Sequence, residues 1–219
     1  MKKLSIIIPT RGRYEKLMRC LDCIPIVDYV QIIIVCDNDK MTYANLKHSR
    51  LFDHLILILI GEHKGSVYCR NQAMEEVKDG IVAICDDMDF RPGMVKEVFD
   101  EYNFYFPNDD GVLGLRHNYD HHPSGTAIVG KEFLKYYPDK QLFYPRYYQF
   151  AAQEIHWLAS KLNKFQMSKN IIINHHHPCF EKDEMDITHT EARKFKKEDM
   201  SLIAKRQKLG LIWGWENGE

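Results

Sequence analysis

Apolar runs and helical periodicities alternate along the first hundred residues of the chain. Continuous apolar runs predict four buried strands, at residues 4–9, 31–36, 55–60 and 81–85. Apolar side chains recur at helical spacing over residues 14–24. A second helix is predicted to start with Ser66 as its N-cap and to stop at Gly80, and a third begins near Pro92. This alternation predicts an α/β fold with a mostly parallel sheet and helices on both faces.

The second half of the chain is less regular but contains both kinds of element. Strands are predicted at residues 112–115, 126–129 and 170–174, and helices over 149–162 and, briefly, after Gly130. The last helix opens with Thr188-x-x-Glu191, a capping-box pattern, and runs to Gly210. It is rich in basic residues, namely Arg193, Lys194, Lys196, Lys197, Lys205, Arg206 and Lys208. We find no internal repeat and no linker to a second domain.

Polar and acidic residues follow the predicted strands of the first half. Thr10 and Arg11 come after the first strand, Asp37 after the second, and the cluster Asp86-Asp87-Met88-Asp89 after the fourth. In open α/β sheets, ligands bind beyond the carboxyl ends of the strands. We therefore expect these side chains to converge on one ligand site.

Two groups of side chains in the sequence are candidates for a metal site. Asp87 and Asp89 form a D-x-D pair, and hard carboxylate oxygens suit Mg²⁺ or Mn²⁺. His175 and His177 share one face of the predicted strand end, so either one can supply an imidazole ligand. The alternatives are a solvated acidic turn and surface histidines. Glu154, on the helix of residues 149–162, is a candidate general base, with a solvated helix charge as the alternative.

Two common phosphate-binding motifs are missing from the sequence. Residues 61–66 lack the spacing of a P-loop, and no G-x-G-x-x-G follows the first strand. A dinucleotide-binding enzyme is therefore disfavoured, and a phosphate ligand here needs a metal rather than a glycine cradle.

Four segments of the first half together resemble family 2 glycosyltransferases. Residues 5–13, Ser-Ile-Ile-Ile-Pro-Thr-Arg-Gly-Arg, resemble the opening strand of that family, and residues 32–37 resemble its second strand. Residues 65–73 are similar to its G-x-x-x-x-R-N-x-[GA] helix, and residues 80–93 to its acidic segment and the following Pro-Gly. Gln153-Glu154 stands where the family usually shows Glu-Asp.

The resemblance implies a GT-A-type, Rossmann-like fold over residues 1–180. Residues 1–105 are then the nucleotide-binding half, residues 106–180 the acceptor half, and residues 181–219 a basic helical tail. It implies inverting transfer of a sugar from a nucleotide diphosphate, UDP being the first choice, with Mn²⁺ or Mg²⁺ as cofactor. The implied nucleotide-binding residues are Pro9, Thr10, Arg11, Asp37, Arg70, Asp86 and Asp87.

The resemblance also implies roles for individual residues at the site. Asp37 is expected at the nucleobase and Asp86 near the ribose, while Arg70 contacts the nucleotide or braces the acidic cluster. Asp87, Asp89 and a histidine of the pair His175 and His177 are expected to hold the metal. Glu154 is expected to take the proton of the acceptor hydroxyl.

Other functions remain open at this point. A nucleotidyltransferase that makes a nucleotide sugar is one alternative, although residues 9–13 match its glycine-rich loop poorly. A non-catalytic module that binds nucleotide sugars or glycans is another. The acceptor is expected to be a glycan, a lipid-linked sugar or a modified DNA base, the last suiting a viral enzyme. The basic tail is either a solvated helix face or a surface that closes over the diphosphate or binds an anionic acceptor.

Composition limits the class and the location of the protein. The 219 residues carry a formal net charge of −1, which argues against a surface that binds nucleic acid all over but allows a local basic patch. The six cysteines, several within apolar runs, suit free thiols in a reducing compartment. We see neither a signal peptide nor an apolar stretch long enough for a bilayer, and expect a cytoplasmic protein, with peripheral membrane contact still open.

Overall fold

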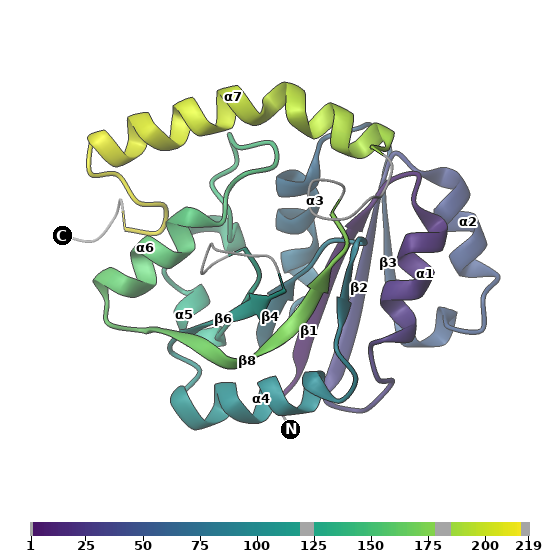
Figure 1. Cartoon of the computed structure of the whole chain (residues 1–219), viewed down its shortest axis with the longest axis horizontal. Helices are drawn as coiled ribbons and strands as arrows, with labels where there is room; N and C mark the ends of the chain where they lie inside the picture. The colour runs from purple at the N-terminus through teal and green to yellow at the C-terminus, as the bar shows by residue number, and fades with distance from the viewer. Residues whose placement is uncertain (1, 119–124, 178–184, 216–219) are drawn as a thin grey trace.

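An eight-stranded mixed sheet forms the centre of the fold (Figure 1). The computed structural model describes residues 2–118, 125–177 and 185–215. The strands lie in the order β3-β2-β1-β4-β7-β6-β8-β5. Their bounds are β1 Leu4–Thr10, β2 Val30–Asp37, β3 Leu55–Ile60, β4 Gly80–Ala83, β5 Met88–Phe90, β6 Val112–His117, β7 Ala127–Val129 and β8 Phe165–His175.

The first four strands form the parallel half of the sheet. β1 pairs with β2 and with β4, and β2 pairs with β3, all in parallel. Every residue of β1 is buried, as its continuous apolar sequence predicts for a strand covered on both faces. Thr10 lies opposite Cys36, so β1 and β2 end together at one edge of the sheet.

The second half of the sheet is mixed rather than parallel. β7 runs antiparallel to both β4 and β6, and β5 runs antiparallel to β8, whereas β6 and β8 are parallel. The pairing of β5 with β8 sets Met88 opposite His175. It therefore brings the acidic cluster beside the histidine run, although almost ninety residues separate the two in sequence.

Helices cover both faces of the sheet, as predicted (Figure 1). One buried apolar cluster joins the sheet to α1, α2 and α4, and the other joins it to α3, α5, α6 and α7. The bounds are α1 Tyr14–Asp22, α2 Lys40–Lys47, α3 Ser66–Ala73, α4 Met94–Tyr105, α5 Lys131–Leu134, α6 Gln153–Lys161 and α7 Ile187–Lys208. Single 3₁₀ turns, η1 to η3, lie at Phe52–His54, Met74–Glu76 and Pro138–Lys140.

The long helix α7 crosses the top of the molecule in Figure 1, from above α1 to above α6. Two buried polar side chains of α7 attach it to the body. The Asp199 carboxylate accepts the backbone N–H groups of residues 148–150 at 2.8–3.0 Å, and Arg206 pairs with Glu154. No helix within the described residues is both long and apolar enough to cross a bilayer.

Several predicted element boundaries differ in the structure. Gly65, with φ +87°, precedes α3 in place of Ser66, and Gly80 begins β4 rather than ending a helix. α6 starts at Gln153 rather than residue 149, because Asp199 binds the backbone N–H groups just before it. Asp186, rather than Thr188, caps α7 by accepting the His189 backbone N–H.

Candidate nucleotide and metal site

A cleft lies between the carboxyl ends of β1, β2 and β4 and the first turns of α7. Three adjoining cavities share Cys85 and Gln149. The ends of β1 and β2 line the first cavity. Residues around Asp87 and His175 line the two others. The larger of those two, lined by Asp87, measures about 480 Å³.

Asp37, at the end of β2, is buried and fully engaged by protein donors. Its carboxylate accepts the backbone N–H groups of Lys64 and Gly65, both at 2.9 Å, and lies 2.6 Å from His63 Nδ1. Asp37 therefore fixes the loop that begins α3. His63, which the sequence did not single out, lines the same cavity as Asp37.

Tyr148 forms the wall opposite Asp37. Its hydroxyl contacts His63 Nε2 at 2.5 Å, and its ring stacks on Phe195 of α7 with centroids 3.8 Å apart. A Cβ on Gly65 would lie 2.6 Å from the Tyr148 ring. The close approach of Gly65 therefore depends on its lack of a side chain.

Asp86 is held at the base of the cleft by two side chains from the end of β1 and the turn after it. Thr10 donates its hydroxyl hydrogen bond at 2.6 Å, and Arg13 donates at 2.8 Å. Burial and the neighbouring charge of Asp87 raise the pKa of Asp86, while Arg13 opposes the rise. Pro9 and Thr10, which the resemblance assigns to the nucleotide, line the same cavity.

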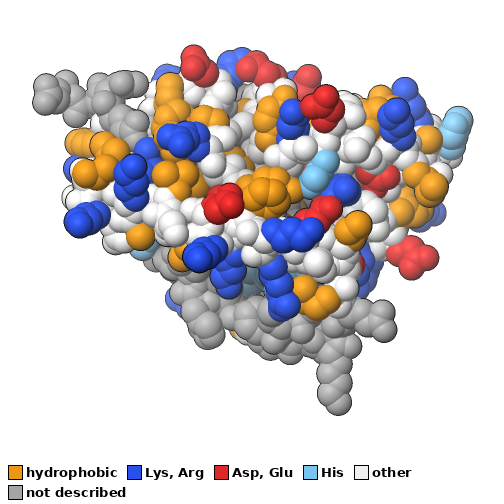
Figure 2. Space-filling model, turned by 90° about the horizontal axis from the view of Figure 1, so that it is seen from above, with side chains coloured by type: hydrophobic (Ala, Val, Ile, Leu, Met, Phe, Trp, Pro, Cys, Tyr) orange, Lys and Arg blue, Asp and Glu red, His pale blue; other side chains and the backbone are white. Residues whose placement is uncertain are grey.

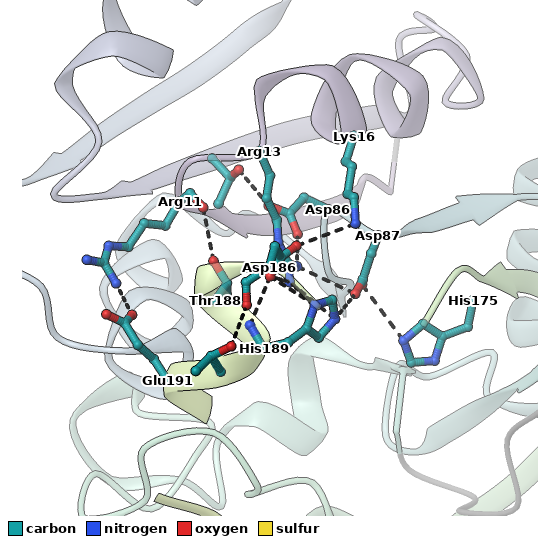
Figure 3. Close-up of polar contacts among 12 residues, drawn as sticks. Arg11, Arg13, Lys16, Asp86, Asp87, His175, Asp186, Thr188, His189 and Glu191 are labelled. Atoms are coloured by element: carbon teal, nitrogen blue, oxygen red, sulfur yellow. Dashed lines mark hydrogen bonds and ion pairs between the residues drawn. The ribbon is translucent and has the colours of Figure 1, made fainter. Parts of the chain in front are cut away.

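Arg13 joins three segments of the chain, as Figure 3 shows. Its guanidinium lies 3.5 Å from Asp87, 2.8 Å from Asp186 and 2.8 Å from His189 Nδ1. Burial disfavours the charged guanidinium, but the carboxylates of Asp86 and its neighbours outweigh this and raise the pKa of Arg13. The first turn of α7 is thereby tied to the acidic cluster.

Asp87 lies among histidines of β8 and α7. One oxygen, Oδ2, is 3.2 Å from His189 Nε2, and the other, Oδ1, is 3.8 Å from His175 Nε2 (Figure 3). Burial raises the pKa of Asp87, but His189, His175 and Arg13 outweigh it and lower the pKa to about 2. Oδ1 is buried and has no hydrogen-bond partner among the described residues, so it can accept a cation.

His177 completes this group of side chains. Its ring lies 5.3 Å from that of His175 and 4.7 Å from that of His189. Burial and the two neighbouring histidines lower the pKa of His177 to about 4, which keeps the ring neutral at pH 7. Within residues 2–118, 125–177 and 185–215, no three side chains already stand in metal-binding geometry. A carboxylate together with imidazoles is nevertheless a donor set that divalent transition-metal ions accept.

Asp89 points into a different environment from Asp87. Its carboxylate lies 2.6 Å from His176 Nε2 and 3.2 Å from Arg19. The structure thus brings Asp87 together with His175 and His177 and places Asp89 with the intervening histidine. No contact between described residues joins the two carboxylates of the predicted D-x-D pair.

Glu154, the predicted base, is 2% exposed and lines none of the three cavities. Its carboxylate accepts hydrogen bonds from Arg206, at 2.7 Å and 3.0 Å, from the backbone N–H of Trp213 at 2.5 Å, and from the Tyr147 hydroxyl. This environment gives Glu154 a structural role as the anchor of α7. Its role as base stays a prediction.

Arg70 and Arg11, the two arginines that the resemblance assigns to the nucleotide, contact other side chains around the cleft. Arg70 donates to Cys85 Sγ at 3.0 Å and to the Ser66 hydroxyl at 3.1 Å, so it braces the residue before the acidic cluster. Arg11 forms an ion pair with Glu191 of α7. Arg11 borders the cavity on the side where the resemblance implied a nucleotide, whereas Arg70 lines the smaller cavity that also contains His175.

Sequence analysis missed the contribution of α7 to this site. Asp186, His189 and Glu191 lie a hundred or more residues after Asp86, and helical periodicity says nothing about such a contact. The available signal was the acidic residue Asp186 three positions before His189, a spacing typical of an N-cap. The capping-box pattern Thr188-x-x-Glu191 instead favoured Thr188 as the N-cap.

No protein-family model matches the chain, and no curated protein matches it. Solved structures do match. Staphylococcus aureus TarS superposes with a TM-score of 0.63 at 14% identity, over 80% of this chain and 37% of TarS. The same protein truncated to its residues 1–349 gives 0.62 at 14% identity, over 79% of this chain and 60% of the fragment.

A third solved structure covers more of the chain. The mannosyltransferase PcManGT of Pyrobaculum calidifontis, in complex with GDP-Man and Mn²⁺, gives a TM-score of 0.62 at 11% identity. The match covers 94% of this chain and 75% of that one. Together these similarities confirm the predicted GT-A-type fold: the chain folds as the core of these glycosyltransferases does.

Proposed function

We propose that the protein is a divalent-metal-dependent glycosyltransferase that moves a sugar from a nucleotide diphosphate to an acceptor hydroxyl. The observation that carries the proposal is Asp87, whose buried Oδ1 faces His175 at the carboxyl edge of the sheet. This edge is where α/β folds bind ligands. The structural neighbour PcManGT was solved with GDP-Man and Mn²⁺, which supports the same ligand class.

Four side chains are positioned to hold the metal: Asp87, His175, His177 and His189. When bound, the ion supplies Lewis-acid stabilisation of the diphosphate leaving group, worth on the order of several kcal/mol. This assignment keeps Asp87 and the predicted histidines and adds His189. Asp89 belongs instead with Arg19 and His176.

The nucleotide is proposed to lie between Thr10, Asp37 and Asp86. Asp37 uses its oxygens on His63 and two backbone N–H groups, so it shapes the base pocket through His63. Arg11 and Arg13 stand on the same side, where positive charge suits a diphosphate. Inversion at the anomeric carbon is part of the proposal on the resemblance alone.

Calorimetric titration with UDP, GDP and their sugars, with Mn²⁺ or with chelator, tests the proposal. We expect metal-dependent binding of one nucleotide, which is lost in Asp87→Asn and kept in the matched variant Asp89→Asn. Loss in Asp89→Asn alone would restore the D-x-D register expected from sequence. Binding of no nucleotide diphosphate in the presence of metal would refute the donor class.

The nucleotidyltransferase remains the second candidate function. The same protein incubated with a sugar phosphate and a nucleoside triphosphate would then release pyrophosphate. We expect no release, because the glycine-rich loop typical of that class is missing after β1. Release of pyrophosphate without donor hydrolysis would favour the second candidate.

A further inference from the structure

Two of the three acidic side chains of helix α7 are engaged within the fold, whereas most of its basic side chains are exposed. Glu191 pairs with Arg11, and Asp199 is buried against backbone N–H groups, so both acids are used inside the fold. Glu198 is the only acidic residue of α7 that is exposed. The exposed basic residues are Arg193, Lys194, Lys196, Lys197, Lys205 and Lys208.

Four of the exposed lysines of α7 have little to neutralise them within the described part of the protein. Lys194, Lys197, Lys205 and Lys208 form no ion pair with any residue in the described ranges. The helix has 22 residues and is therefore about 33 Å long. Figure 2 shows Lys and Arg side chains spread over the face that α7 covers. The four unpaired lysines span residues 194–208 of this helix, about 21 Å, and a row of cations of this length suits an extended polyanion.

The basic row leads directly into the proposed site. Arg193 and Lys196 line the same cavity as Asp87 and His175. The cavity of about 480 Å³ also contains the ring of Phe150, over which Lys196 lies at 5.8 Å. An acceptor that follows α7 therefore has a place where one of its units enters beside the proposed metal ligands.

We propose, on the basis of the proposed glycosyltransferase function, that the acceptor is a nucleic acid strand. Its phosphates lie along the lysines of α7, and one nucleotide turns into the cavity to receive the sugar. The ring of Phe150 offers a flat surface for a base beside the proposed metal ligands, and enzymes that modify bases extrude them in this way. A lipid surface fits less well, because Ile203 of α7 is packed against the body, and the exposed Ile187 and Met200 are separated along the helix by charged side chains.

Fluorescence anisotropy with a labelled 20-nucleotide DNA single strand, titrated at several salt concentrations, tests this inference. We expect the quadruple variant Lys194→Gln, Lys197→Gln, Lys205→Gln and Lys208→Gln to weaken binding by about tenfold or more at low salt. Each lost phosphate contact lowers the slope of log affinity against log salt by about 0.7, so the slope falls by about 3. Phe150→Ala is expected to weaken binding about fivefold or more through lost stacking.

The matched control removes four exposed lysines far from α7. These are Lys78, Lys96, Lys131 and Lys135, each changed to Gln. The control has the same net charge as the α7 variant and is expected to bind DNA as the wild type does. Equal weakening in both variants would show a nonspecific charge effect and overturn the inference.

Two further probes separate nucleic acid from other anions. Inorganic polyphosphate of matched charge is expected to bind more weakly than DNA, and vesicles with phosphatidylserine are expected not to compete. Equal binding of polyphosphate, or binding of vesicles in place of DNA, overturns the nucleic acid assignment. Metal-dependent nucleotide binding, measured separately in the same variants, is expected to be unchanged. If the wild type shows no metal-dependent nucleotide binding, the proposed function is refuted. If the wild type binds nucleotide but not DNA, only the proposed acceptor is refuted.

Discussion

The buried pair of Glu154 and Arg206 gives the sharpest test of how α7 is held. Both side chains are nearly inaccessible, at 2% and 4% exposure, and Glu154 also accepts from the Trp213 backbone. Glu154→Gln removes the negative charge and leaves the Arg206 guanidinium buried without a counter-charge. Breaking a buried ion pair from one side costs about 3–5 kcal/mol, so we expect a loss of this size in the free energy of unfolding.

Urea unfolding, followed by circular dichroism, measures this loss. With a slope of about 2–3 kcal/mol per molar urea, the midpoint is expected to fall by about 1–2.5 M. The double variant Glu154→Gln with Arg206→Met removes both charges and is expected to recover about 1–3 kcal/mol relative to the single variant. Asp100→Asn, which breaks the exposed pair with Lys96, is the control and should leave the midpoint nearly unchanged.

The same variant separates the two roles of Glu154. If Glu154→Gln unfolds at the wild-type urea concentration and binds nucleotide but has lost turnover, the anchor reasoning is refuted. The base role expected from the resemblance is then supported. If stability falls as predicted, the anchor role is supported, and a loss of turnover in this variant no longer identifies Glu154 as the base.

Three further predictions concern the site and its supports. His189→Asn should weaken metal-dependent nucleotide binding about tenfold or more in calorimetry, and exposed His54→Asn should not; equal effects would exclude His189 from the metal site. Asp39→Ala should lower the free energy of unfolding by about 1 kcal/mol, because the Asp39 carboxylate caps α2. Burial raises the pKa of Asp39, but its hydrogen bonds outweigh burial and lower the pKa. Asp39 therefore contributes fully to the free energy of unfolding above its unfolded pKa of about 4, and this contribution is lost as pH falls through the lowered pKa of the folded state. Urea curves of wild type and Asp39→Ala should converge over that fall in pH. Gly65→Ala should cost about 1–3 kcal/mol and weaken nucleotide binding, since φ is +87° and the new Cβ meets the Tyr148 ring; unchanged stability would contradict this.

The parallel half of the fold was predictable because its signals are local. β1 is apolar at almost every position, and a short continuous apolar run of this kind is typical of a buried strand. The polar residues at its end, Thr10 and Arg11, follow from topology, because parallel strands end at one edge. Helix α2 was not predicted, although Asp39 caps it by accepting the backbone N–H of Thr42.

The part of the site that sequence could not provide depends on long-range pairing. The antiparallel pairing of β5 with β8 sets Met88 opposite His175 and so brings the acidic cluster beside the histidine run, where His175 lies near Asp87 and His176 near Asp89. Another register would bring other residues of β8 beside the acidic cluster. The spacing Asp87-x-Asp89 alone holds no information about that register.

The charge of α7 shows why composition concealed a basic surface. The whole chain has a formal net charge of −1, which had argued only against a surface that is basic throughout. Folding separates the charges of α7, because a carboxylate is buried only where it accepts hydrogen bonds. The Asp199 carboxylate accepts three from backbone N–H groups. Lysines, which have long stems and strongly hydrated ammonium groups, remain outside. The contacts that fix α7 over the cleft therefore also leave its outer side basic, next to the cavity where an acceptor has to enter.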